Sequence, residues 1–163
     1  MRFIFFTQKD GLTEINGFRK KFSGQNRGVD AVFDPADPAV ASQVYKKTGG
    51  GFDVIIETSA VDAGINLSLM MLKPKGGLVL AGINAHTQAI LTILAAAREV
   101  TQKSVMAYLS EEFDTAIDYI ADKRIDVGKL VTGTTGLTGI DKAFERLASG
   151  TSEDIKIICK AGI

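Results

Sequence analysis

The clearest hydrophobic pattern in this chain lies between Gly50 and Ile83, where two apolar runs flank a helical stripe. Residues 53–57 and 78–81 are crowded with apolar and β-branched side chains and bordered by glycine, which predicts two buried strands. Between them, four apolar residues follow the spacing of one helix face, namely Val61, Ile65, Leu69 and Leu72. The stretch predicts a βαβ unit of a parallel sheet, where ligands bind just past the carboxyl ends of the strands.

Strand and helix patterns alternate through the rest of the chain, which predicts an α/β fold. Further strands are expected at residues 3–7, 30–33, 103–109, 130–132 and 154–159. Further helices are expected at 8–23, from Pro38 to the glycines at 49–51, at 88–99, from Ser110 and around 140–147. Two of these helices carry apolar stripes that we expect to be buried: Phe113, Ile117, Ile120 and Ala121, and Ile140, Ala143, Phe144 and Leu147.

Composition removes several classes of function. Lys and Arg together number 19 and match the 19 Asp and Glu, so no basic surface for nucleic acid is indicated. With one cysteine, Cys159, and one histidine, His86, the chain can form neither an internal disulfide nor a zinc site of several Cys or His ligands. No apolar run reaches the length of a membrane span, and the apolar start ends at Phe6, too early for a signal peptide. We therefore expect a cytoplasmic protein.

Five segments, in order, resemble the C-terminal half of a zinc alcohol dehydrogenase-like medium-chain dehydrogenase/reductase. They read GVDAVFDP, GGFDVIIETSA, LKPKGGLVLAGI, KSVMAYL and AFERLASGTSEDIKIIC, and the resemblance runs from about Val29 to Cys159. It implies an incomplete Rossmann-like parallel sheet with helices on both faces. Residues 1–109 would form part of the dinucleotide-binding domain, and residues 110–163 a tail that packs on the family's catalytic domain. The family transfers hydride between NAD or NADP and an alcohol or carbonyl, with zinc polarising the substrate oxygen.

The departures from the family lie at the phosphate and metal sites. The first strand and its G-x-G-x-x-G turn are missing, and Gly49-Gly50-Gly51 precedes a strand, so these glycines are interpreted as a helix terminator. Residues 3–7 are interpreted as the family's second strand, where Thr7 or Gln8 replaces the acidic residue that binds the ribose. Loss of the central strand leaves residues 3–7 and 53–57 to pair directly or to accept another chain. We expect no zinc to be bound and assign no catalytic residue.

The resemblance assigns the cofactor contacts to strand ends. They are Thr7, Thr58, Ser59, Ala81, Gly82 and Ile83, with Ala107 and Tyr108 on the far side. The alternative is an ordinary strand-to-helix turn in which Ser59 only caps the helix. Glu57 is interpreted as a structural carboxylate, His86 as a solvated loop residue, and Cys159 as a buried, inert thiol.

Three functions remain open on the sequence. The first is a truncated zinc-type alcohol dehydrogenase-like protein, whose family acts on alcohols and polyols and which does not catalyse on its own. The second is a methyltransferase-like domain, which a final antiparallel hairpin beside the fifth strand would support. The third is a non-catalytic subunit that pairs with a full-length dehydrogenase through exposed strand edges. Self-association of the chain is a further expectation, because its apolar stripes need a surface to cover them.

Overall fold

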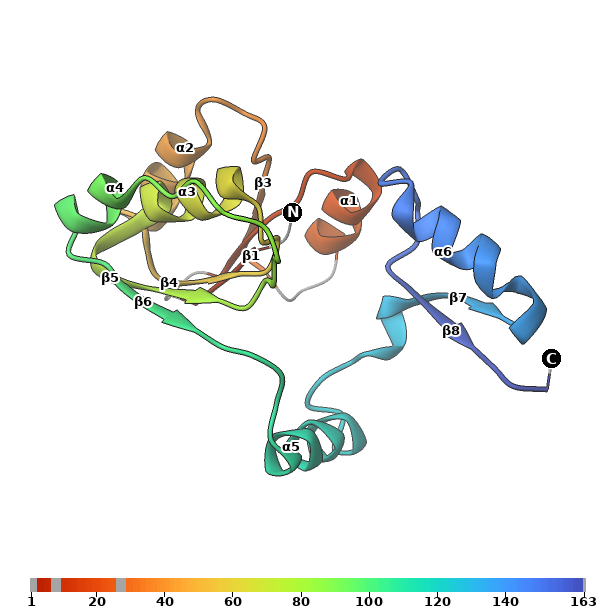
Figure 1. Cartoon of the computed structure of the whole chain (residues 1–163). Helices are drawn as coiled ribbons and strands as arrows, with labels where there is room; N and C mark the ends of the chain where they lie inside the picture. The colour runs from red at the N-terminus through yellow and green to blue at the C-terminus, as the bar shows by residue number, and fades with distance from the viewer. Residues whose placement is uncertain (1–2, 7–9, 26–28, 163) are drawn as a thin grey trace. The chain divides into compact units, whose positions relative to one another are not determined.

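The computed structural model describes residues 3–6, 10–25 and 29–162, with the backbone alone for residues 3–6. It divides the chain into two compact units, Met1–Met106 and Ala107–Ile163, which are described separately below (Figure 1). None of the helices in the described ranges is both long enough and apolar enough to cross a membrane.

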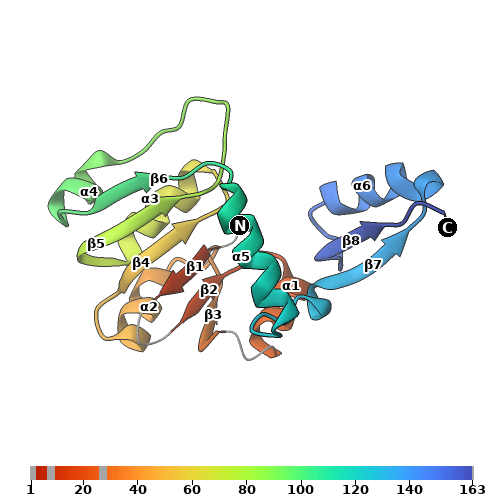
Figure 2. The same ribbon diagram turned by 90° about the horizontal axis from the view of Figure 1, so that it is seen from below.

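Within the described residues, the first unit is built on a six-stranded sheet in the order β3-β2-β1-β4-β5-β6 (Figure 2). The strands are β1 (Phe3–Phe6), β2 (Gly11–Thr13), β3 (Ala31–Phe33), β4 (Phe52–Glu57), β5 (Leu72–Leu80) and β6 (Thr101–Ser104). Strand β1 is antiparallel to both its neighbours, and the other five run in one direction. This confirms the predicted α/β, Rossmann-like architecture.

The central slot of the sheet is filled by β1. Phe3 lies opposite both Thr13 of β2 and Glu57 of β4, so residues near the N-terminus pair directly with β4, the first of the two alternatives expected. Assigning these residues to the family's second strand was wrong, because β2 occupies that place. The helix predicted at 8–23 was also wrong in its first half. Helix α1 (Gly17–Gln25) begins after Asn16, whose Oδ1 accepts the Arg19 N–H at 3.0 Å.

Helices α2 (Val40–Thr48), α3 (Asp62–Met71) and α4 (Thr92–Ala97) cover one face of this sheet (Figure 1). The core between them and the strands is formed by Phe33, Val40, Val44, Phe52, Ile55, Ile65, Leu69, Met71, Leu72 and Leu78. Three residues of the predicted α3 stripe are thus buried, whereas Val61 precedes the helix and is exposed. Helix α1 packs against β3. The chain crosses the sheet from β2 to β3 in the opposite direction to its crossing from β4 to β5, so the right-handed rule for such crossovers assigns α1 to the face opposite α3. Helices on both faces are therefore confirmed.

Glycine ends α2 as predicted. Gly49 follows the helix in the left-handed conformation with φ of 78°, and its N–H donates to the Tyr45 carbonyl. Strand β5 is longer than predicted and begins at Leu72, so the Pro74 and Gly76 region is part of a strand rather than a turn.

The second unit contains α5 (Ser110–Ala121), β7 (Val131–Thr135), α6 (Ile140–Ala148) and β8 (Lys156–Cys159), with short 3-10 turns at Gly128–Leu130 and Leu137–Gly139. Strands β7 and β8 pair in parallel, so they do not form the antiparallel hairpin that would support a methyltransferase-like domain. Burial was mispredicted here: α5 buries no residue, Phe144 is exposed, and Cys159 is exposed rather than buried. In α6 only Ala143 is buried.

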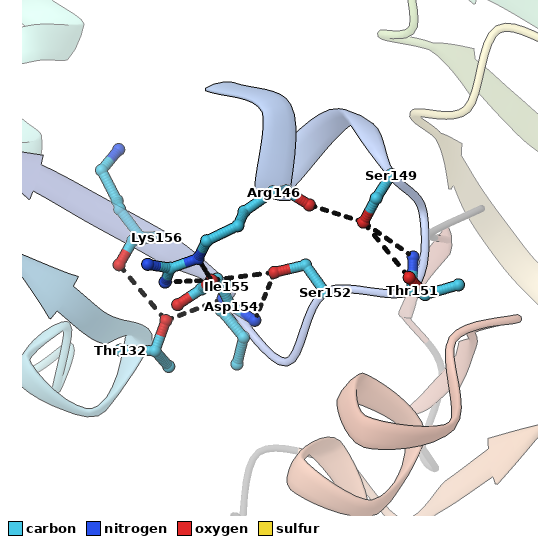
Figure 3. A network of polar contacts seen from close by, with 8 residues as sticks. All are labelled: Thr132, Arg146, Ser149, Thr151, Ser152, Asp154, Ile155 and Lys156. Atoms are coloured by element: carbon cyan, nitrogen blue, oxygen red, sulfur yellow. Dashed lines mark hydrogen bonds and ion pairs between the residues drawn. The ribbon is translucent and has the colours of Figure 1, made fainter. Parts of the chain in front are cut away.

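A polar network fixes α6 to the start of β8 (Figure 3). The Asp154 carboxylate is almost fully buried and accepts from Arg146 Nε at 3.0 Å and Nη2 at 2.5 Å, and from Ser152 Oγ at 2.8 Å. These donors, the guanidinium first, hold the pKa of Asp154 below its usual value. Thr132 Oγ1 accepts the Ile155 N–H at 2.8 Å and links β7 to the same turn. The network is satisfied internally, which indicates a structural role.

Candidate cofactor crevice

The carboxyl ends of the five parallel strands meet at one edge of the sheet. Because Phe3 lies opposite both Thr13 and Glu57, the ends of β2 and β4 flank the beginning of β1. Glu57 pairs in turn with Leu80, and Leu80 with Ser104, so β4, β5 and β6 end at the same level. This edge is where ligands bind in open parallel sheets.

Glu57, the last residue of β4, organises the turn that follows it. Its side chain is fully buried and accepts the Ser59 N–H at 2.7 Å, the Ala60 N–H at 3.0 Å and the Ser59 hydroxyl. The turn holds Ala60 at φ of 56°, a left-handed conformation that non-glycine residues rarely adopt. The carboxylate is therefore occupied by the turn, as the structural interpretation of Glu57 predicts.

The turn after β5 is fastened to the turn after β4. Ala81 and Gly82 donate their N–H groups to the Glu57 carbonyl at 2.8 and 2.9 Å. A Cβ added to Gly82 would lie 2.6 Å from the Ala60 nitrogen, so only glycine permits this approach. The side-chain amides of Asn84 and Gln88 both donate to the Ala60 carbonyl, at 2.9 and 2.8 Å. The two turns consequently form one rigid platform.

A hollow of about 220 Å³ opens on this platform. It lies at the ends of β4, β5 and β6, and polar and apolar groups share its lining. The lining residues are Glu57, Ile65, Leu80, Gly82, Ile83, Asn84, Gln88, Ser104 and Val105. The Glu57 carboxylate is committed to the turn, and the amides of Asn84 and Gln88 are polar side-chain groups that line the hollow.

The structure brings together most, but not all, of the predicted cofactor contacts. Gly82 and Ile83 line the hollow, and Thr58, Ser59 and Ala81 belong to the two turns of the platform. Ala107 and Tyr108 belong to the second unit, where the Tyr108 ring stacks on Phe113 with centroids 5.5 Å apart. Thr7 lies outside the described residues. Contact of these residues with a cofactor stays a prediction.

Sequence reasoning missed Glu14, the residue that directly follows β2. Its side chain is fully buried, and its Oε1 accepts the N–H groups of Ile15 and Asn16, both at 3.0 Å. An acidic residue at the end of the second parallel strand is the usual partner of the adenosine ribose in dinucleotide-binding sheets. The signal in the sequence is an acidic residue two positions before the helix cap Asn16, and it identifies Glu14 only if β2, rather than residues 3–7, is the second strand.

The strand in the central slot differs from the family at the phosphate position. In dinucleotide-binding sheets, the central strand runs into a glycine-rich turn and a helix, whose N–H groups bind the pyrophosphate. Here β1 begins at this edge and runs away from it, so its carboxyl end lies at the opposite edge of the sheet. The central strand therefore delivers no helix N-terminus to the crevice.

Metal-binding side chains do not converge in the part of the chain that the structure describes: no three His, Cys, Asp or Glu residues are placed to share an ion. His86 is exposed in the loop after β5, where its N–H donates to Asn84 Oδ1 at 2.9 Å. Cys159 is exposed on β8 in the second unit.

Comparison with known proteins gives a consistent result. The family described as zinc-binding dehydrogenase matches residues 13–122. A probable D-xylulose reductase A of Aspergillus clavatus is 26% identical over 138 residues, which are 82% of this chain and 37% of that protein. A 2R,3R-butanediol dehydrogenase of Bacillus subtilis superposes with a TM-score of 0.76 and 22% identity, covering 90% of this chain and 42% of that structure.

An alcohol dehydrogenase of Escherichia coli CFT073, solved in complex with NADH, superposes with a TM-score of 0.75 and 15% identity. The superposed region makes up 89% of this chain and 42% of the E. coli chain. At these identities the superpositions show the fold alone. The chain spans about two fifths of the length of the relatives that it matches.

Proposed function

This chain belongs to the zinc-binding dehydrogenase family, and on that premise we propose that it supplies the nicotinamide-binding wall of an NAD-dependent dehydrogenase acting on alcohols or polyols. The observation that carries the proposal is the platform formed by the Glu57 and Gly82 turns at the carboxyl edge of the sheet. Its rigidity is what a site for a flat, hydride-carrying ring requires, because hydride transfer depends on holding two reacting atoms in fixed geometry.

The roles of individual residues follow from their positions on the platform. The backbone of Gly82 and Ile83, together with the Asn84 and Gln88 amides, would contact the nicotinamide half of the cofactor. NAD or NADP, when bound, accepts or donates the hydride. Thr58 and Ser59 would lie toward the ribose, and Ser59 has its hydroxyl already directed at Glu57.

We propose NAD rather than NADP because of Glu14. A carboxylate at the end of β2 can accept a hydrogen bond from the ribose 2′-OH, whereas it repels the 2′-phosphate of NADP. Its Oε1 is anchored by two backbone N–H groups, which fixes the direction of the carboxylate. The side chain is fully buried, so binding requires the residues around β2 to open toward the cofactor.

The residues of this chain do not fit a catalytic zinc ion. A catalytic zinc site takes three protein ligands, and the described residues gather no such set. We therefore propose that the chain does not catalyse hydride transfer alone, and that zinc and its ligands come from a further polypeptide segment.

The proposed binding of the nicotinamide half of the cofactor to the platform can be tested by NMR titration. Adding NAD⁺ at millimolar concentration to ¹⁵N-labelled protein should shift the amide signals of Ser59, Gly82 and Ile83, and NADP⁺ should shift them less. Gly128 and Gly150 in the second unit serve as controls and should not move. Equal shifts throughout the chain, or none at the platform, contradict the proposal.

A separate experiment tests the proposal that the chain does not catalyse hydride transfer alone. With Zn²⁺, NAD⁺ and 2,3-butanediol, or with NADH and D-xylulose, the chain alone should not change the absorbance at the NADH band above background. Steady turnover that scales with protein concentration and survives repeated purification overturns this expectation.

A second candidate function, a non-catalytic subunit of a full-length dehydrogenase, is favoured by an apolar hollow in the second unit. The hollow has a volume of about 330 Å³ and is lined by Thr135, Ile140, Ala143, Phe144, Leu147, Ile157 and Cys159. Its lining is almost wholly apolar, as expected of a surface that another domain covers. Co-expression with a full-length relative should give a stable complex that Phe144→Asp disrupts, and independent migration of the two proteins contradicts this function.

A further inference from the structure

A long connection joins β5 to α4 beside the crevice. Residues 81–91 form no helix or strand of their own and run alongside α3 (Figure 1), whereas connections in compact domains have a median length of about 4–6 residues. The part from residue 84 to residue 91 is called here the strap. Within the strap, Ile90 alone packs against the core, and no side chain is buried. Hydrogen bonds must therefore hold most of the strap in place.

Two polar side chains of α3 bind the strap. Asp62 and Asn66 lie about one helical turn apart and therefore on the same side of the helix. Asp62 Oδ2 accepts the Ala89 N–H at 2.9 Å. The Asn66 amide uses both of its ends, since Nδ2 donates to the Ala89 carbonyl at 2.9 Å and Oδ1 accepts the Leu91 N–H at 2.8 Å. Asn66 thus pairs with the strap as a peptide group of a neighbouring strand would.

The strap is also attached to the platform, and the order of its contacts gives its direction. Asn84 and Gln88 donate to the carbonyl of Ala60, the residue two positions before Asp62. Residue 88 thus bonds to residue 60, residue 89 to residues 62 and 66, and residue 91 to residue 66. The strap therefore runs in the same direction as α3, from the turn after β4 to the second turn of the helix.

Gln88 connects the α3 contacts with the hollow. Its side chain lines the hollow, and the peptide group between Gln88 and Ala89 carries the N–H that Asp62 accepts. Asp62 therefore fixes the backbone from which the Gln88 side chain projects, and Asn66 fixes the peptide group after Ala89. Gln88 Nε2 donates to Ala60, whereas Gln88 Oε1 has no hydrogen-bond partner among the residues that the structure describes. This oxygen is an unused acceptor on a side chain that borders the hollow.

Helix α3 gives these contacts a firm support, because Ile65 and Leu69 of the same helix are buried in the core. A binding group carried on a loop is placed less precisely than one on a helix unless further contacts fix the loop. Asp62 and Asn66 supply such contacts, so the strap takes its position from a helix that the core holds. Precise placement matters at this site, since hydride transfer depends on a fixed geometry between the reacting atoms.

We propose that Asp62 and Asn66 are positioning residues for the nicotinamide half of the cofactor. By fixing the strap, they hold Gln88 against the hollow, where its Oε1 accepts a hydrogen bond from the carboxamide of the nicotinamide ring. Asp62 and Asn66 themselves do not touch the cofactor. This role rests on the proposed binding of the nicotinamide ring to the platform, and it adds the residues through which α3 controls that binding.

Amide hydrogen exchange, measured by NMR without any ligand, tests whether α3 fixes the strap. Asn66→Ala should speed exchange at the Leu91 amide, and Asp62→Ala at the Ala89 amide, each by about three- to tenfold, because each amide loses its acceptor. Asp62→Asn keeps an acceptor oxygen and should restore the protection of Ala89. Met70→Ala, at an exposed position of the same helix, is the matched control and should change neither amide. Unchanged exchange at both amides in N66A and D62A overturns the proposal.

Calorimetric titration with NAD⁺ and with ADP-ribose, which lacks the nicotinamide ring, separates this role from the proposed function. The wild-type chain should bind NAD⁺ more tightly than ADP-ribose. N66A and D62A should lower the affinity for NAD⁺ about three- to tenfold and leave the affinity for ADP-ribose unchanged, and D62N should restore NAD⁺ binding. An equal loss of affinity for both ligands would make the two residues merely structural and overturns the role. A wild-type chain without a preference for NAD⁺ contradicts the proposed function and this role together, whereas a preference that survives in N66A and D62A overturns the role alone.

A double-mutant cycle tests whether Asn66 acts through Gln88. Gln88→Leu should lower the affinity for NAD⁺ by a factor similar to that of Asn66→Ala. Adding Asn66→Ala to Q88L should then cause little further loss, because the side chain that Asn66 positions is gone. Losses that multiply independently in the double variant overturn the proposed action through Gln88.

Discussion

The fixed position of the crevice depends on the Glu57 carboxylate, and Glu57→Gln is the substitution that tests this. In the native chain, the carboxylate accepts the Ser59 N–H, the Ala60 N–H and the Ser59 hydroxyl. The amide of glutamine keeps one acceptor oxygen and introduces an NH₂ group. Whichever way the amide is oriented, a donor then faces one of the buried donors of the turn.

The expected cost follows from that single mismatch. A buried donor left unpaired costs about 1–3 kcal/mol, so the free energy of unfolding of the first unit should fall by about this amount. For a unit of this size, each kcal/mol lowers the melting temperature by about 4–8 °C. Glu57→Ala removes all acceptors at once and should cost more than the glutamine variant.

The assay is urea unfolding followed by far-UV circular dichroism and by the amide signal of Gly82, whose N–H donates to the Glu57 carbonyl at 2.9 Å. The matched control is Glu99→Gln. Its side chain is 73% exposed and lies 3.9 Å from Lys75, so the change should stay within about 0.5 kcal/mol. If E57Q unfolds at the wild-type urea concentration with the Gly82 signal unmoved, the carboxylate does not hold the platform.

Three further predictions concern packing and charge. Gly82→Ala should destabilise the first unit by about 1–3 kcal/mol in thermal melts, because its Cβ would meet the Ala60 backbone, whereas Gly128→Ala, 3.4 Å from a flexible carboxylate, should change little. Leu69→Ala should cost about 2–5 kcal/mol in urea unfolding, because Leu69 is fully buried, and equal stability of L69A and the exposed-site variant Phe144→Ala would contradict the assigned core. Asp154 has a folded-state pKa below its unfolded value of about 3.9, so its stabilisation is present above that pH and is lost as the pH falls through the folded pKa. Asp154→Asn should abolish this part of the acid sensitivity of the second unit, measured by circular dichroism, and an unchanged acid transition would show that the carboxylate is not responsible.

The sequence predicted the βαβ region around β4, α3 and β5 well, because long apolar runs and a regular stripe report burial directly. It failed at residues 8–23, where Leu12, Ile15 and Phe18 happen to follow helix spacing. The three residues of β2 are too few to show strand periodicity. Their conformation is determined by pairing with β1 and β3, which are contacts that local spacing does not contain.

The absence of long-range contacts from local sequence spacing also explains why Glu14 was missed and why Cys159 and Phe113 were expected to be buried. Glu14 could not be recognised until β2 had its place in the sheet, since its significance comes from the strand it follows. Cys159 and Phe113 were expected to be buried because apolar periodicity identifies which face of an element prefers contact. It does not identify whether the surface that makes this contact is on the same chain.

The reversed direction of β1 also affects how the sheet assembles. β1 and β2 are joined by only residues 7–10, so they can pair as a hairpin, which forms in about 1–10 μs, much faster than a strand-helix-strand crossover allows. Strands β1–β3 come from the first 33 residues and β4–β6 from residues 52–104. The β1–β4 ladder is the only strand pairing that joins these two halves among the described residues. Its formation, across about 50 residues of intervening chain, should be the slow step that makes the sheet one cooperative unit.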